Sequence, residues 1–165
     1  MDLTLLHPKV VHLPIALAVL MPLVAAGLAV AWHRAWLNRR SWVIAVLFQL
    51  ALVVSSFAAM QTGEIDEERV ERVVPEAAIE AHEEAAEVFT WSAAAVLLLM
   101  VLPLVIRNES AARRVAAAAA VSTLVLFGLG YRVGEAGGAL VYEHHAAQAF
   151  SASTVTGIAP HDDDD

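Results

Sequence analysis

The chain has 165 residues, of which 59% are hydrophobic and 17% charged. Soluble domains average about 45–50% apolar and about 25% charged residues. This composition, together with a mean hydropathy of +0.63, excludes an ordinary soluble enzyme. The formal net charge of −8 argues against nucleic acid as a partner, because nucleic-acid-binding faces are basic. The absence of cysteine excludes disulfides, iron–sulfur clusters, thiolate zinc sites and covalently attached haem.

Four apolar stretches follow one another along the chain, and we expect each to form a membrane-spanning helix. The first three reach the length of about 18 residues that is typical of a span, and the fourth reaches it if its helix continues outward. Because a segment in hydrocarbon must satisfy its own backbone hydrogen bonds, all four should be α-helices. The stretches are Val10–Trp32, Trp42–Met60, Val88–Ile106 and Val115–Tyr131.

The predicted fold class is all-α, an integral-membrane antiparallel four-helix bundle. It occupies residues 1–150, because polar flanks should extend some of the apolar stretches as helix. The tail, residues 151–165, is rich in Ser and Thr and ends in four aspartates, so we expect it to be disordered. The predicted helices cover about residues 8–33, 41–62, 76–106 and 111–148.

The charges of the connections predict the orientation in the membrane. The first connection, residues 33–41, holds three arginines and no acid, and the third, residues 107–114, holds three arginines and one glutamate. The second, residues 64–87, holds ten acids and two arginines. The positive-inside rule therefore places the first and third connections in the cytoplasm. Both termini should then lie on the periplasmic side of a bacterial inner membrane.

The histidines gather at the outer ends of the predicted helices, with His33 alone at the cytoplasmic end. At a rise of about 1.5 Å per residue, His12 lies about 33 Å above Arg34 and His82 about 38 Å above Arg107. The two histidines therefore share a layer near the outer interface. Ionisable residues within or at the rim of a membrane bundle are costly and indicate a functional site, although interfacial histidines can also be partly exposed headgroup neighbours.

One candidate for this layer is a single non-covalent haem b ligated by His12 and His82, with His144 as a substitute ligand. Two neutral imidazoles from facing helices can ligate haem iron, and small residues let the porphyrin approach the backbone. A stripe of glycines on the fourth helix would fit a haem edge, although small residues at this spacing are also typical of plain helix packing. The stripe consists of Gly130, Gly134 and Gly138.

A second candidate is a bare zinc, copper or iron ion, since imidazole and carboxylate suit these metals. A third is a purely structural subunit whose polar rim docks a partner.

The acidic segment Glu76–Glu87 is either a solvated face or a docking patch for a basic periplasmic electron carrier. Motifs of metalloproteases, phosphate-binding loops and serine hydrolases are absent from the sequence. The candidate metal ligands are His7, His12, His82, His144 and Glu64.

Two motifs carry a resemblance to a known family. Residues 7–17 read His-Pro-Lys-Val-Val-His-Leu-Pro-Ile-Ala-Leu, and residues 137–144 read Gly-Gly-Ala-Leu-Val-Tyr-Glu-His. The chain, over roughly residues 5–148, resembles the bacterial membrane family called domain of unknown function 2231. The resemblance implies a four-helix membrane protein in a respiratory or electron-transfer setting, because some members accompany cytochrome c-like modules.

The resemblance implies that His7, His12 and His144 occupy the positions of the family's motif histidines, and His82 matches such a position less closely. The chain departs from the family pattern at Ala139, where an acid is usual, and at His145, where glycine is usual. The choice between His144 and His145 as a ligand therefore stays open.

The function expected from these observations is that of a membrane subunit of an electron-transfer system, more an accessory than a catalytic chain. It would hold one haem b near the outer face, with the lipid bilayer and other membrane or periplasmic redox proteins as partners. The alternatives are a non-redox protein that binds a divalent metal through the same histidines, and a structural subunit of a larger complex.

Overall fold

The computed structural model describes residues 6–149, and all regular structure within them is helical. Four helical segments are long and apolar enough to cross a membrane, namely His7–His33, Arg39–Ile65, Glu76–Val105 and Glu109–Tyr142. The all-helical fold and its four spans are therefore confirmed, while the expected tail lies outside the described residues. The elements are α1 (Leu6–Val10), α2 (His12–His33), the 3-10 turn η1 (Arg39–Trp42), α3 (Val43–Val70), α4 (Glu76–Val105) and α5 (Glu109–Tyr142).

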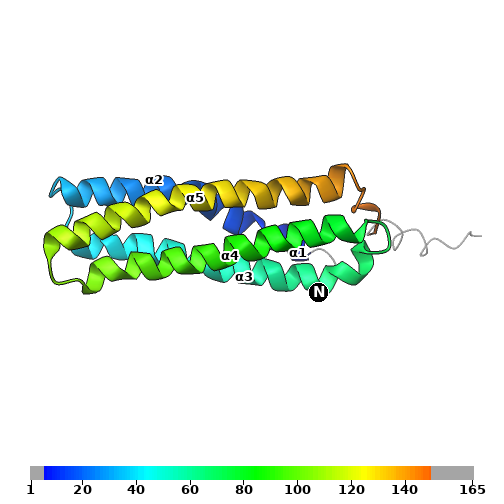
Figure 1. The fold of residues 1–165 in the computed structure, drawn as a ribbon, viewed down its shortest axis with the longest axis horizontal. Helices are drawn as coiled ribbons and strands as arrows, with labels where there is room; N and C mark the ends of the chain where they lie inside the picture. Colours follow the sequence, from blue (N-terminus) through cyan, green and yellow to red (C-terminus); the bar gives the residue numbers. More distant parts are fainter. Residues whose placement is uncertain (1–5, 150–165) are drawn as a thin grey trace, which may run out of the picture.

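The long helices form an elongated bundle in which each packs on two neighbours. Helix α2 contacts α3 and α5, and α4 contacts the same two helices, so the four close into a ring. Figure 1 shows the connections at residues 34–38 and 106–108 at one end of this bundle and the connection at residues 71–75 at the other. The two arginine-rich connections thus share one end, and the acidic connection lies at the opposite end.

The first span is interrupted near its start, where Val11 separates α1 from α2. Pro14 has no N–H to donate to the carbonyl four residues before it, which weakens the helix at this point. Backbone hydrogen bonds still cross the break, from Val11 N to His7 O (3.1 Å) and from Ile15 N to Val11 O (3.2 Å). The single helix expected over residues 8–33 is therefore two segments, and the short one, α1, packs against α3.

Two helix ends differ from the sequence prediction. Helix α3 continues to Val70 instead of ending near residue 62, because a polar segment outside the apolar stretch can stay helical when it is rich in glutamate. Helix α5 ends at Tyr142 instead of continuing to 148. A turn in which His145 has a φ of 58° brings Ala146 into a small core with Val74 and Ile79.

Helix α5 buries mainly small residues, whereas large apolar side chains cover its outer face. On α5, Val121 and Val125 are 63% and 62% exposed. In the most apolar window of each span only 28–39% of the residues are buried, so most apolar side chains face outward, as expected for contact with lipid. Small residues at the interface let helix backbones approach closely. The alanines that α5 buries are Ala112, Ala116, Ala119 and Ala120.

Side-chain hydrogen bonds to backbone carbonyls join α3 to α4 inside the bundle. The indole Nε1 of Trp42 donates to the carbonyl of Met100 at 2.8 Å, and Nε2 of Gln49 donates to the carbonyl of Ala93 at 2.9 Å. Both polar side chains are almost completely buried. Because the surrounding medium offers no water, each such bond fixes the register of one helix against the other.

Replacement of Trp42 by alanine should therefore destabilise the bundle. The indole is 1% exposed, and truncation of a buried aromatic residue costs about 3–5 kcal/mol. The matched control is Trp36→Ala, because Trp36 is 73% exposed in the adjacent connection. Unfolding in detergent, followed by circular dichroism, should show a clear loss for Trp42→Ala and little change for Trp36→Ala. Equal stability of the two variants would contradict the role of Trp42 as an anchor.

Candidate functional site

Two histidines from segments far apart in the sequence meet at the end of the bundle opposite the arginine-rich connections. The ring centroids of His7, on α1, and His82, on α4, are 6.5 Å apart, and the ring planes are nearly perpendicular at 85°. Both residues are half-buried. We refer to them as the His7–His82 pair.

The His7 ring is held in one orientation by α3. Its Nδ1 lies 2.9 Å from the carbonyl oxygen of Ala59 and 3.2 Å from the hydroxyl of Thr62. Because a carbonyl can only accept, Nδ1 carries the proton, and in the neutral imidazole Nε2 is left with a free lone pair. Gly63 makes room for the ring, since a Cβ there would lie 3.4 Å from Cε1 of His7.

The His82 ring is held against α5. A Cβ at Gly137 would lie only 3.0 Å from Cε1 of His82, so a glycine is needed for this close approach. The Nδ1 of the ring is buried without a hydrogen-bond partner among the described residues. Buried polar atoms without a partner are rare in native proteins.

The pair thus offers two nitrogens for a ligand. Nε2 of His7 has a free lone pair because the Ala59 carbonyl fixes the proton on Nδ1, and Nδ1 of His82 has no hydrogen-bond partner among the described residues. Histidines that ligate metals characteristically donate their other ring N–H to a carbonyl or a carboxylate. Neutral imidazoles of this kind can bind a transition-metal ion or exchange a proton. Because each zinc–nitrogen bond is about 2.0–2.1 Å long, the two rings, whose centroids are 6.5 Å apart, would have to move closer together to share one tetrahedral ion.

The other histidines expected in the site lie elsewhere. His12 is exposed and His144 half-buried, and in the part of the chain that the structure describes neither side chain forms a hydrogen bond or a ring contact. Glu64 is exposed and accepts a hydrogen bond from Nε2 of Gln61 at 3.2 Å. The structure therefore places His7, and not His12, against His82. Among the described side chains, no three His, Asp or Glu residues form a metal-binding group.

The three glycines of the expected stripe differ in their surroundings. At Gly130 a Cβ would meet Phe89 at 3.3 Å and Ala18 at 3.5 Å, which is helix packing. At Gly134 and Gly138 a Cβ would have no neighbouring atom within 4 Å, so both glycines face open space. The glycine of α5 that contacts a histidine is Gly137, which sequence reasoning missed although it begins the closing motif.

The His7–His82 pair does not line either of two hollows in the described part of the bundle, which have volumes of about 100 and 330 Å³. Both rings are packed against helix backbone, His7 at Gly63 and His82 at Gly137. A porphyrin between them would have to displace these contacts.

The contact between Gly137 and His82 can be tested by alanine substitutions on α5. Alanine is more stable than glycine in a helix interior by about 0.5–1 kcal/mol, so Gly134→Ala, which points into open space, should stabilise the protein. Gly137→Ala should forfeit this gain, because the new methyl group would press on the His82 ring. Thermal unfolding in detergent compares the two variants. A Gly137→Ala variant as stable as Gly134→Ala would show that the close approach is unimportant.

Comparison with known proteins assigns the chain to a family. No curated protein and no solved structure matches this chain. A family model described as "Predicted membrane protein (DUF2231)" matches residues 4–149. The match includes all described helices and both motifs that carry the resemblance. The chain therefore belongs to the DUF2231 family of predicted membrane proteins.

Proposed function

We propose that this membrane protein binds one transition-metal ion at its outer end through the His7–His82 pair. The observation that carries the proposal is the surroundings of the two rings. The Ala59 carbonyl orients His7, Gly137 lets His82 pack closely on α5, and each ring retains one nitrogen able to bind a metal. A purely structural pair would have no need of the unpartnered nitrogen on His82.

In this proposal the helices form an antiparallel bundle in a bacterial inner membrane, with both termini on the periplasmic side. The three arginines of the first connection and the three of the third support it, because they gather at one end of the bundle and positive loops stay in the cytoplasm. The His7–His82 pair would then face the periplasm.

Zinc, copper and iron are the metals that suit two imidazoles. Two protein ligands leave coordination positions open, and open positions are used by water, a substrate or a ligand from a partner. The chain would accordingly act as an accessory subunit that presents a metal ion to a membrane or periplasmic partner, and redox proteins are the partners implied by the resemblance.

The second candidate is the haem b subunit of an electron-transfer system, with His7 and His82 in place of His12 and His82 as axial ligands. Its support is the same pair of neutral imidazoles from different helices. It requires room for a porphyrin between rings that pack against glycines, which is a larger rearrangement than a single ion requires, and we therefore favour the metal.

The metal proposal predicts that His7→Ala and His82→Ala each reduce the bound metal at least tenfold. His12→Ala and His33→Ala are the matched controls, because both residues are exposed and stand apart from the pair. Detergent-purified protein is loaded separately with zinc and with copper, dialysed and analysed for metal content. Wild-type protein without bound metal, or full retention by His82→Ala, would refute the proposal. A Soret band in the absorption spectrum of untreated wild-type protein would establish the haem candidate instead.

The orientation predicts the labelling of single cysteines, which is simple to test in a chain that has none. A cysteine at Ser41, beside the arginines of the first connection, should be shielded from an impermeant thiol reagent added to spheroplasts. A cysteine at Ala77, which is exposed at the start of α4, should react. The opposite pattern would reverse the topology and place the His7–His82 pair in the cytoplasm.

A further inference from the structure

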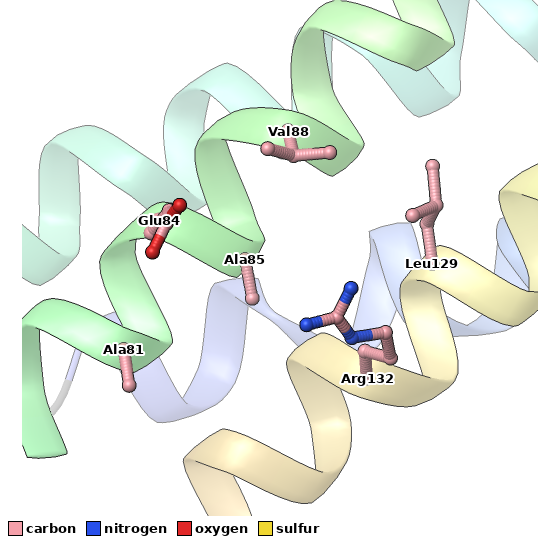
Figure 2. A pocket seen from close by; sticks show the side chains of 6 residues that line it. All are labelled: Ala81, Glu84, Ala85, Val88, Leu129 and Arg132. Carbon is pink, nitrogen blue, oxygen red and sulfur yellow. The ribbon is translucent and has the colours of Figure 1, made fainter.

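A groove between α4 and α5 carries two charged side chains that the proposed metal site does not use. Figure 2 shows Arg132 extending from α5 toward α4, across small residues of that helix. The hollow has a volume of about 100 Å³. We call it the Arg132 groove. Its lining residues are Ala81, Glu84, Ala85, Val88, Leu129 and Arg132.

The Arg132 groove lies where the outer boundary of the hydrocarbon is expected. Arg132 is about 27 Å along α5 from Arg114, and Val88 is about 26 Å along α4 from Val105, while the hydrocarbon of a bilayer is about 30 Å thick. The neighbouring Tyr131 is 67% exposed, as is typical of the aromatic belt at a membrane interface. The groove is thus at the depth of lipid headgroups.

The two charges of the groove have no partner among the residues that the structure describes. Neither Arg132 nor Glu84 forms an ion pair or a hydrogen bond among the described side chains, and both are exposed. A guanidinium is suited to bidentate binding of phosphate. A carboxylate on the facing helix accepts hydrogen bonds from a primary ammonium group. Val88 and Leu129 add apolar surface to the same hollow.

We propose that the Arg132 groove binds a zwitterionic phospholipid with a primary ammonium group, such as phosphatidylethanolamine. Arg132 holds the phosphate, Glu84 holds the ammonium group, and the acyl chains run along Val88 and Leu129 toward the membrane centre. The charge order matches the headgroup, with one cation and one anion on facing helices. This site is separate from the His7–His82 pair and does not depend on the metal.

The surrounding charges favour this lipid over an anionic one. Glu80, Glu83 and Glu87 are exposed on the same helix as Glu84, and like charges would repel a headgroup with net negative charge. Phosphatidylglycerol lacks the ammonium group, and the quaternary ammonium of phosphatidylcholine cannot donate a hydrogen bond. Free phosphate would gain nothing from the apolar part of the groove.

The experiment titrates delipidated full-length protein in detergent with phosphatidylethanolamine and counts bound lipid by native mass spectrometry. Separate titrations use phosphatidylglycerol, phosphatidylcholine and inorganic phosphate. Phosphatidylethanolamine should bind most tightly. Arg132→Gln should weaken its binding roughly tenfold or more, because a charge-assisted hydrogen bond is lost. Glu84→Gln should remove the preference over phosphatidylglycerol.

Controls separate the groove from general charge effects. Glu80→Gln removes a carboxylate one helical turn before Glu84, and Arg107→Gln removes an exposed arginine at the opposite end of the bundle. Neither should change the binding of phosphatidylethanolamine. Arg132→Lys keeps the charge without the bidentate geometry and should bind more weakly than wild type but more tightly than Arg132→Gln. Circular dichroism verifies that each variant is folded.

Three results would overturn the proposal. The first is unchanged binding of phosphatidylethanolamine by folded Arg132→Gln. The second is equal affinity of wild type for phosphatidylglycerol and phosphatidylethanolamine. The third is binding of inorganic phosphate as tight as that of the lipid, which would make the groove an anion site.

Discussion

The structure depends on one constraint, which is that a polar group surrounded by hydrocarbon must find its partner within the protein. The backbone meets it by forming helices over all four apolar stretches. Buried polar side chains meet it by donating to carbonyls of a neighbouring helix, as Trp42 does to Met100 and Gln49 to Ala93. Trp32 adds a bond of 2.8 Å from its indole to the carboxylate of Glu109, which links α2 to α5. Since lipid does not drive apolar faces together, these bonds and the close packing of alanines hold the helices in place.

The same constraint is not met at the end of the bundle that holds the His7–His82 pair, where a buried polar atom lacks a partner among the described residues. Three buried side-chain atoms lack a partner among the described residues, Arg39 Nε, Gln49 Oε1 and His82 Nδ1. The first two belong to side chains that already donate to a carbonyl. Only the His82 nitrogen is an imidazole nitrogen beside a second imidazole. An unmet hydrogen-bonding requirement at that place is a sign of a ligand, and the proposed metal ion would meet it.

The break between α1 and α2 is what brings the second histidine to this place. Because Pro14 interrupts the helix, α1 leaves the line of α2 and packs on α3, where Ala59 and Thr62 receive His7. His12, one residue beyond the break, starts α2 and is exposed. A straight first helix would have left no reason to prefer one of these histidines over the other.

Hydropathy and charge were sufficient to predict the helical class and the four spans, because lipid imposes these features on any chain that crosses it. The rise per residue placed both His12 and His82 near one end, but height along a helix says nothing about the direction in which a side chain points. The pairing of His7 with His82, the role of Gly137 in place of Gly134 and Gly138, and the end of α5 at Tyr142 were decided by tertiary contacts. Each depends on which faces of two helices meet, and that is set by packing between segments far apart in the sequence.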